Sequence, residues 1–284
     1  MRVGFSQPES DLRKLPQFSR GRLMGTDHRW AMPETFEKHI HVEYVMGTVV
    51  TFDVRGVRPP RGTIESAVSW LHDVDAEFST YRQDSPVCRF GRGELSRSAA
   101  SNDLRWVIDR CERLRQETSG FFDAYATGPF DPSALVKGWA VQCAADGLRV
   151  AGIDRFCITA GGDIVAHGRP DRDRRWRIGI RHPDDPQAVA SVIEVDGDVA
   201  VATSGRYERG DHIVDPQSGR GAAGVLSMTV VGPDLGLADA YATAAFAMGL
   251  DGAQWTLGLD GYEAMAILEN ANVLTTPGFP ALTA

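Results

Sequence analysis

The sequence of 284 residues predicts an α+β fold with mixed helices and antiparallel sheets. Two observations predict it. In the first half of the chain, apolar residues recur at the three-and-four spacing of amphipathic helices. From residue 156 onward, short β-branched runs are separated by Gly-, Asp- and Pro-rich turns, a pattern that favours antiparallel strands over a doubly wound parallel sheet.

Helices are expected where apolar spacing and capping residues agree. Ser and Asn side chains accept hydrogen bonds from the unpaired N–H groups at a helix start, and Gly often ends a helix. Gly138 lies inside one of these segments and weakens it. The expected helices are residues 63–78; a helix capped by Ser101 or Asn102 that ends at Gly120; a helix capped by Ser133 over residues 134–152; and residues 237–249.

Strands are expected in runs of β-branched and aromatic residues. Residues 41–54 predict the first extended segment, with Gly47 as a bulge or a point of close approach. The later expected strands are residues 156–159, a segment after Gly161-Gly162-Asp163, 176–180, 189–195, 199–203, 225–231 and 263–268. We expect a polar N-terminal segment over residues 1–37 and a single domain over residues 38–284, since no linker or repeat divides the chain.

Charge and cysteine content limit the partners. The net charge is −8 and Lys and Arg are dispersed, which opposes a nucleic-acid or anionic-membrane surface. No apolar run is long enough for a membrane helix or a signal peptide, so we expect no membrane anchor and a cytoplasmic location. The cysteines are expected to be structural thiols, because no metal-binding spacing connects Cys88, Cys111, Cys143 and Cys157.

Asp239 and Thr243 are a candidate pair of metal ligands. They are four residues apart on an expected helix and therefore share one face, among Ala, Leu, Met and Phe. Two oxygens suit Mg²⁺, which takes few protein ligands and completes its octahedron with water and phosphate. The plainer alternative is that Asp239 stabilises the helix N-terminus and Thr243 bonds to a backbone carbonyl.

Two further segments could contact an anion. Backbone N–H groups after a Ser133 cap, with Lys137 one turn later, would attract a phosphate, although the segment is not a Walker A loop. The alternative is a capped helix with a solvated lysine. The paired glycines before Asp163 permit close approach to a ligand, but they also simply make a tight turn.

Residues 203–216 contain the remaining candidates. The Thr-Ser-Gly segment at 203–205 is small and polar and suits a pocket wall. His-Ile-Val-Asp-Pro predicts a short strand that places His212 and Asp215 on opposite sides, so they form no dyad. His212 suits general base chemistry near neutral pH, whereas a lone histidine is more often structural. Asp215-Pro216 predicts a turn.

The order of these segments is more informative than any one of them. In sequence they are MGT (46–48), FSTY (78–81), SGFFD (119–123), DPSALVKGWA (131–140), AGGDI (160–164), WRIGI (176–180), ATSGRYER (202–209), HIVDPQSG (212–219) and ADAYATAAFAMG (238–249). This series resembles the motif blocks of the ApbE family of FAD:protein FMN transferases over about residues 40–270. The resemblance implies an ApbE-like fold, similar to the T-fold.

The resemblance also implies an activity. Members of the family use Mg²⁺ to move FMN from FAD onto a Thr or Ser hydroxyl of a target flavoprotein, with release of AMP. The implied partners are FAD and such an acceptor protein. Two alternatives stay open: a FAD pyrophosphatase that gives FMN and AMP, and a non-catalytic FAD-binding protein. Retention of the whole set of Lys137, His212, Asp239 and Thr243 argues against mere binding.

The resemblance assigns roles to individual residues. His212 corresponds to a base-like histidine, and Lys137 contributes to both catalysis and FAD binding. The implied metal ligands are the Ala134 carbonyl, Asp239 and Thr243. The FAD site would include Met46, Tyr81, Phe121, Phe122, Asp123, Asp131, Thr203, Ser204, Gly205 and Ile213.

This chain departs from the family pattern in one connection. Many members carry several dozen residues between the G-x-F-D and S-A-x-x-K-G blocks, but here FFDAYATGPFDPSALVKG joins them almost directly. Ala124 stands where Pro is common, and Pro132 stands where Leu is common. Many bacterial members also carry a lipid-anchored N-terminal cysteine, whereas the first cysteine here is Cys88, which again favours a cytoplasmic form.

Overall fold

The computed structural model describes residues 37–185, 187–206 and 213–280. Its main feature is an antiparallel sheet, which has eight strands within these residues, in the order β1-β2-β3-β4-β7-β8-β9-β10. The strands are β1 Glu37–Val45, β2 Thr48–Gly56, β3 Phe156–Ala160, β4 Asp163–His167, β7 Val199–Gly205, β8 Val225–Gly232, β9 Glu263–Leu268 and β10 Val273–Thr275. The predicted α+β class with antiparallel sheets is confirmed.

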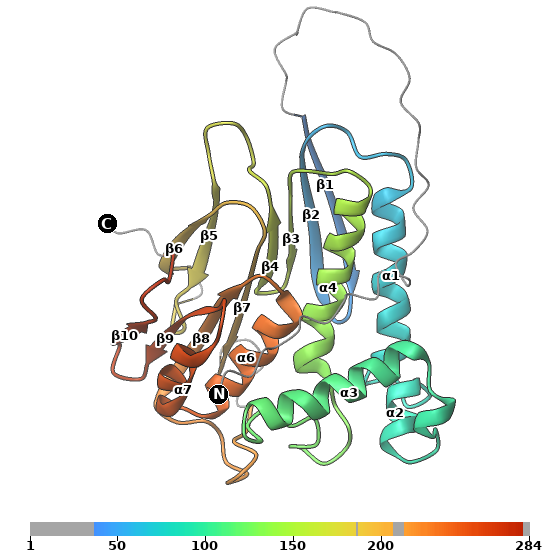
Figure 1. Cartoon of the computed structure of the whole chain (residues 1–284), viewed down its shortest axis with the longest axis vertical. Helices are drawn as coiled ribbons and strands as arrows, with labels where there is room; N and C mark the ends of the chain where they lie inside the picture. Colours follow the sequence, from blue (N-terminus) through green and yellow to red (C-terminus); the bar gives the residue numbers. More distant parts are fainter. Residues whose placement is uncertain (1–36, 186, 207–212, 281–284) are drawn as a thin grey trace, which may run out of the picture.

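Helices cover one face of this sheet (Figure 1). The three that contact the strands most are α1 and α4, which lie side by side, and α6, which packs against α4. The helices are α1 Thr63–Phe78, α2 Pro86–Gly91, α3 Asn102–Glu117, α4 Ser133–Val150, α6 Leu235–Ala247 and α7 Leu250–Trp255. The strand face beneath them buries a large apolar core, which includes Phe52, Phe156 and Met228.

A two-stranded sheet covers part of the opposite face. It consists of β5 Trp176–Arg181 and β6 Val189–Val195. Trp176, Ile178 and Ile193 from this small sheet pack against residues of β4, β7, β8 and β9 in a second apolar cluster. The half of the large sheet from β4 to β9 is therefore covered on both faces, and this half includes β7, whose end reaches the candidate site.

Amphipathic periodicity predicts α1 and α3 well. Helix α1 has the predicted bounds, and Ser101 is the N-cap of α3, where its hydroxyl accepts a hydrogen bond from the Leu104 N–H at 2.9 Å. The predicted N-cap at Ser133 is wrong by one residue, because Pro132 occupies that position. Asp131 supplies the cap-like contact instead, accepting from the Ser133 N–H at 3.0 Å.

The first predicted strand is in fact a hairpin. Met46 and Gly47 both have positive φ, at 55° and 69°, and turn the chain between β1 and β2. The β-branched residues on both sides continue one pattern through the turn, so composition alone did not separate two strands. Gly47 is therefore a turn residue rather than a bulge. Helices α2 and α7 and strand β10 were not predicted.

A close crossing of α4 and α6 positions the chemistry. A Cβ added at Gly138 would lie 2.5 Å from the Leu235 carbonyl oxygen, and one at Gly236 would lie 3.2 Å from the backbone of Trp139. Both glycines let the two helices approach closer than any side chain would allow. Gly138, which weakens α4 as an isolated helix, thus allows Lys137 on α4 to reach Asp239 on α6.

Candidate active site

A cavity of about 500 Å³ opens at the end of the molecule where α4, α6 and β7 meet. Its walls come from distant segments, including the β1–β2 turn, the loop after α1, residues 121–137 and the end of β7. It includes every predicted site residue within the described part of the chain: Met46, Tyr81, Phe121, Phe122, Asp123, Asp131, Ala134, Lys137, Thr203, Ser204, Gly205, Ile213, Asp239 and Thr243. The fold therefore brings the predicted set together.

A lysine lies between two carboxylates at the cavity wall. Lys137 Nζ lies 2.5 Å from Asp163 Oδ2 and 3.8 Å from Asp239 Oδ2. Asp163 is fully buried and Asp239 is 4% exposed. Buried carboxylates require positive charge or hydrogen bonds nearby, and Lys137 supplies the charge to both.

Hydroxyl groups lie next to this charged centre. The Ser204 hydroxyl on β7 is 3.1 Å from the Thr243 hydroxyl on α6. Thr243 shares a helix face with Asp239, as the spacing predicts. The Thr203 hydroxyl turns to Thr229 on β8, at 2.9 Å, and so ties the wall of the cavity to the sheet.

The oxygen donors fit a hard divalent cation. The cavity brings together one buried carboxylate from Asp239, the Thr243 hydroxyl and the first turn of α4 with Ala134. The described residues hold no group of three His, Cys, Asp or Glu side chains with metal-binding geometry. That donor set is too sparse for a cage of protein ligands but suits Mg²⁺, which keeps several waters and takes substrate phosphates as ligands.

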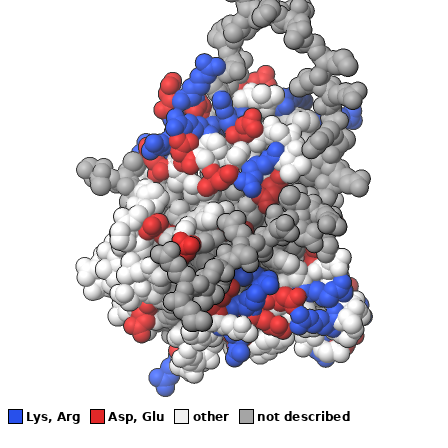
Figure 2. Space-filling view, in the orientation of Figure 1, with Lys and Arg blue, Asp and Glu red and all other residues white. Residues whose placement is uncertain are grey.

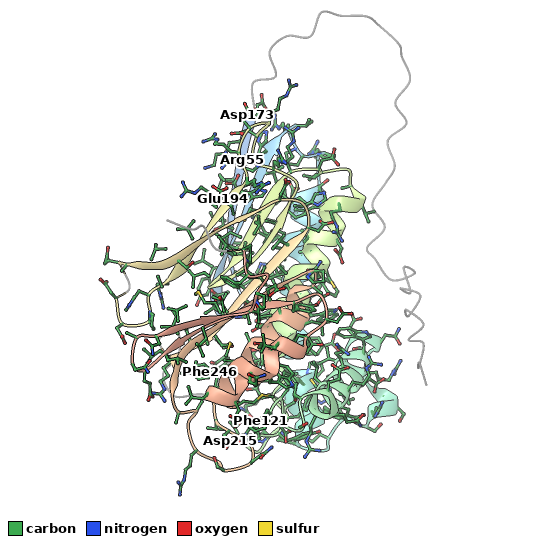
Figure 3. All side chains as sticks on the ribbon, turned by 60° about the vertical axis from the view of Figure 1, so that its left-hand side comes forward. Arg55, Phe121, Asp173, Glu194, Asp215 and Phe246 are labelled. Atoms are coloured by element: carbon green, nitrogen blue, oxygen red, sulfur yellow. The ribbon has the colours of Figure 1, made fainter. Side chains whose placement is uncertain are left out.

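The lining of the cavity also includes aromatic side chains, one of them highly exposed. Phe121 and Phe122 come from the loop after α3, and Tyr81, which is 85% exposed, comes from the loop after α1. Figure 3 shows Phe121 and Asp215 at the same end of the molecule, far from Arg55, Asp173 and Glu194. The aromatic surface formed by Phe121, Phe122 and Tyr81 suits the flat ring of a flavin.

Asp123 and Asp131 shape the connection between Phe122 and α4. Asp123 Oδ1 accepts from the Tyr125 N–H at 2.9 Å, and its Oδ2 accepts from Arg115 at 3.2 Å. Asp131 Oδ1 accepts from both the N–H and the hydroxyl of Ser133. Both carboxylates therefore form local turns as well as lining the cavity.

His212, the predicted base, lies outside the described residues. The structure resumes at Ile213, which lines the cavity with Val214 and Pro216. The predicted strand over residues 212–216 is wrong for the described positions, because Val214 forms only an isolated bridge with Gly221. The predicted turn at Asp215-Pro216 is present: Asp215 accepts from the backbone N–H of Gln217, and a hydrogen bond from the Ser218 hydroxyl lowers the pKa of its carboxyl group.

Sequence reasoning gave no specific role to Asp163. Its carboxylate lies closer to Lys137 than that of Asp239 does, yet it comes from β4, 26 positions further along the chain from that lysine. The motif around it predicts a turn, and the turn is present: Gly161, directly after the end of β3, has a φ of 62°. No rule of residue spacing predicts a buried Lys–Asp contact between a helix and a strand. No signal in the sequence therefore identified the contact between Lys137 and Asp163.

The fold occurs in solved flavin transferases. The flavin transferase ApbE from Vibrio cholerae superposes with a TM-score of 0.76 at 26% identity, covering 87% of this chain and 100% of that chain. The flavinyl transferase ApbE from Pseudomonas stutzeri, in its apo form, gives a TM-score of 0.72 at 21% identity, covering 85% and 94%. At 21% identity, the similarity to the Pseudomonas stutzeri protein concerns the fold alone.

The chain belongs to the ApbE family, whose sequence profile matches residues 46–129 and 127–266. The two matched segments meet at residues 127–129, inside the short connection between Phe122 and α4. The relative from Vibrio cholerae named FAD:protein FMN transferase is 28% identical over 268 residues, covering 72% of this chain and 79% of the relative. The one from Haemophilus influenzae is 25% identical over 296 residues, covering 81% and 80%.

The predicted family and the predicted class of enzyme are therefore confirmed at the level of these relatives. Within the described part of the chain, no helix is both long enough and apolar enough to cross a membrane. On the face drawn in Figure 2, Lys and Arg side chains lie beside Asp and Glu side chains. Among the described residues, Arg92 pairs with Glu94 and Arg97 pairs with Asp109.

Proposed function

We propose that this protein is a Mg²⁺-dependent FAD:protein FMN transferase that moves FMN from FAD onto a Thr or Ser hydroxyl of an acceptor flavoprotein and releases AMP. The observation that carries the proposal is the convergence, in one cavity of about 500 Å³, of Lys137, Asp239 and Thr243 with the aromatic wall around Phe121. The relatives' shared name, FAD:protein FMN transferase, supports the same activity.

FAD would lie with its ring at the open aromatic end and its pyrophosphate at the Lys137 end. The ring then contacts Tyr81 and Phe121, and Met46 from the β1–β2 turn closes one side. The pyrophosphate meets the ammonium group of Lys137, whose charge opposes the negative net charge of the chain. Phosphoryl transfer depends mainly on such positioning and charge stabilisation.

Asp239, Thr243 and the Ala134 carbonyl are the residues that would hold Mg²⁺. When bound there, the ion would neutralise charge on the pyrophosphate and on the departing AMP. Ser204, which contacts Thr243 at 3.1 Å, would keep that hydroxyl oriented. Asp239, buried on α6, is fixed by the close crossing with α4.

His212 is proposed as the base that takes the proton from the acceptor hydroxyl. The acceptor oxygen then bonds to the phosphorus of the FMN half, the bond between that phosphorus and the bridging oxygen breaks, and AMP leaves with the bridging oxygen. The position of Ile213 in the cavity wall supports this role, since His212 is the preceding residue.

AMP release tests the chemistry. The protein is incubated with FAD, either in Mg²⁺ or in EDTA, with a threonine-containing flavoprotein as acceptor, and AMP and free FMN are quantified by chromatography. The proposal predicts Mg²⁺-dependent AMP without an equal amount of free FMN. AMP matched by free FMN identifies a pyrophosphatase, and no AMP in Mg²⁺ identifies a binding protein; either result would overturn the proposal.

A further inference from the structure

The strongest unassigned feature next to the cavity is the buried carboxylate of Asp163. Asp163 is fully buried and does not itself line the cavity, yet its Oδ2 lies 2.5 Å from Lys137 Nζ. Its Oδ1 accepts from the Thr203 N–H on β7, at 3.4 Å. The carboxylate is thus fixed to the sheet on one side and holds a cavity lysine on the other.

The backbone keeps Asp163 in this position. It is the first residue of β4 and pairs with Ala160 across the tight turn that begins at Gly161. The N–H of Gly161 donates to the Val49 carbonyl at 3.3 Å, which anchors the turn to β2. Because its backbone is part of a central strand, the Asp163 carboxylate has little freedom to move. The flexible Lys137 side chain therefore adjusts its position to that of the carboxylate.

Lys137 needs such a constraint. Its side chain has four rotatable methylene groups and is 21% exposed, so the ammonium group could otherwise occupy many positions around the cavity. The second carboxylate, on Asp239, is 3.8 Å from Nζ and is the weaker contact. Asp163 therefore determines where the positive charge faces the cavity and keeps the lysine from collapsing onto Asp239.

We propose that Asp163 is a positioning residue that holds the ammonium group of Lys137 against the pyrophosphate of bound FAD. The inference rests on the proposed function, because it takes FAD as the ligand of this cavity. Asp163 touches no part of the ligand and acts only through Lys137.

The test measures binding of two flavins without metal or turnover. FAD and riboflavin, which lacks both phosphates, are titrated by calorimetry in EDTA into the parent protein, D163N, K137M and the double variant. Loss of a charge-assisted contact is expected to weaken FAD about tenfold in both D163N and K137M. Riboflavin affinity is expected to stay unchanged, and the double variant should bind FAD no more weakly than K137M.

D198N is the matched control. Asp198 pairs with Arg149 at 2.8 Å, near the other end of the same helix α4, and does not line the cavity. Its loss removes an ion pair from α4 without touching Lys137, so both flavin affinities should match those of the parent protein.

The possible outcomes distinguish the positioning role of Asp163 from the place of Lys137 in the proposed function. Unchanged FAD affinity in D163N, or equal weakening of FAD and riboflavin, would overturn the role of Asp163. Unchanged FAD affinity in K137M would overturn the place of Lys137 in the proposed function itself. If D163N does not fold, D163E decides: the proposal predicts weaker FAD binding than in the parent but stronger than in K137M, with riboflavin unaffected, and any loss of riboflavin affinity counts against it.

Discussion

At the residue scale, the candidate site includes two oxygen-bearing side chains on one face of α6. Asp239 and Thr243 are separated by four positions, share a helix face and both line the cavity. The sequence left open a plainer role for each: dipole stabilisation for Asp239 and a backbone contact for Thr243. The structure gives Thr243 a partner on β7, Ser204, and places Asp239 near Lys137. Both contacts cross between elements and are consistent with a functional site.

Replacing Asp239 by Asn tests the proposed metal ligand. The change keeps the size of the side chain but removes the charge that a hard cation requires. We expect AMP release to fall by about a hundredfold or more, and added Mg²⁺ to give little recovery. Activity is measured as AMP formed per minute at saturating FAD, with D198N as the control. Undiminished AMP release in D239N would contradict the assignment.

Replacing His212 by Gln tests the proposed base. Glutamine retains hydrogen bonding but cannot accept a proton at neutral pH, so FMN transfer is expected to slow by about a hundredfold or more. FAD binding in EDTA should be little changed, because the role concerns the acceptor hydroxyl. Transfer is followed as flavin fluorescence in the denatured acceptor band on a gel. A variant that transfers FMN at the parent rate would remove His212 from the mechanism.

At the element scale, the crossing of α4 and α6 is the feature on which the site geometry depends. Gly138 and Gly236 allow the two helices to approach, and Gln142 on α4 accepts from the Leu235 N–H at 3.0 Å. These contacts place Lys137 and Asp239, which belong to different helices, within 3.8 Å of each other. A small shift between the helices would therefore change the distance between Lys137 and Asp239 at the cavity.

Gly138→Ala tests this crossing. The added Cβ would lie 2.5 Å from the Leu235 carbonyl oxygen and 3.0 Å from Asp239 Cβ, so the helices must separate. Overpacking of this kind costs about 1–3 kcal/mol, although alanine alone favours a helix. We expect a lower melting temperature together with loss of AMP release.

Gly258→Ala is the control for that prediction. Gly258 has no heavy atom within 4 Å of an added Cβ and does not have a positive φ. Its melting temperature should be equal to or slightly above that of the parent protein. An equal or higher melting temperature in G138A as well would show that α4 and α6 are not in tight contact.

Sequence patterns predicted those elements whose burial is periodic. The helix over residues 63–78 follows from apolar spacing alone, and the structure reproduces its bounds. The β1–β2 hairpin was not separated into two strands because Met46 carries the turn with a positive φ that a non-glycine residue seldom adopts. Motif order predicted a set of residues that the fold brings to one cavity, whereas Asp163 was given no role because its contact to Lys137 is tertiary.

At the scale of the whole molecule, the packing of helices and sheets buries Cys111 and partly buries Cys143 and Cys157. Burial raises the pKa of Cys111 and of Cys157 to about 12, and it also raises the pKa of Cys143. Since only the thiolate is nucleophilic, a raised pKa keeps these groups protonated and unreactive at neutral pH. The raised pKa values agree with the expectation that Cys111, Cys143 and Cys157 are structural thiols.

Alkylation of the native protein tests that enclosure. At pH 8, which is far below these raised pKa values, iodoacetamide should modify Cys111, Cys143 and Cys157 much more slowly than it does in guanidinium-unfolded protein. Peptide mass spectrometry measures the modified fraction at each position over time. Equal labelling rates in native and unfolded protein would show that the described core does not form.

Transfer to a protein is the central claim for the whole molecule, and the intact mass of the acceptor tests it most directly. A flavoprotein domain with a single Thr acceptor is incubated with this protein, FAD and Mg²⁺, denatured, and weighed by mass spectrometry. The account predicts a mass increase equal to one FMN less one water, lost when that Thr is replaced by Val and when Asp239 is replaced by Asn. An acceptor of unchanged mass, with FAD consumed in the same reaction, would contradict it.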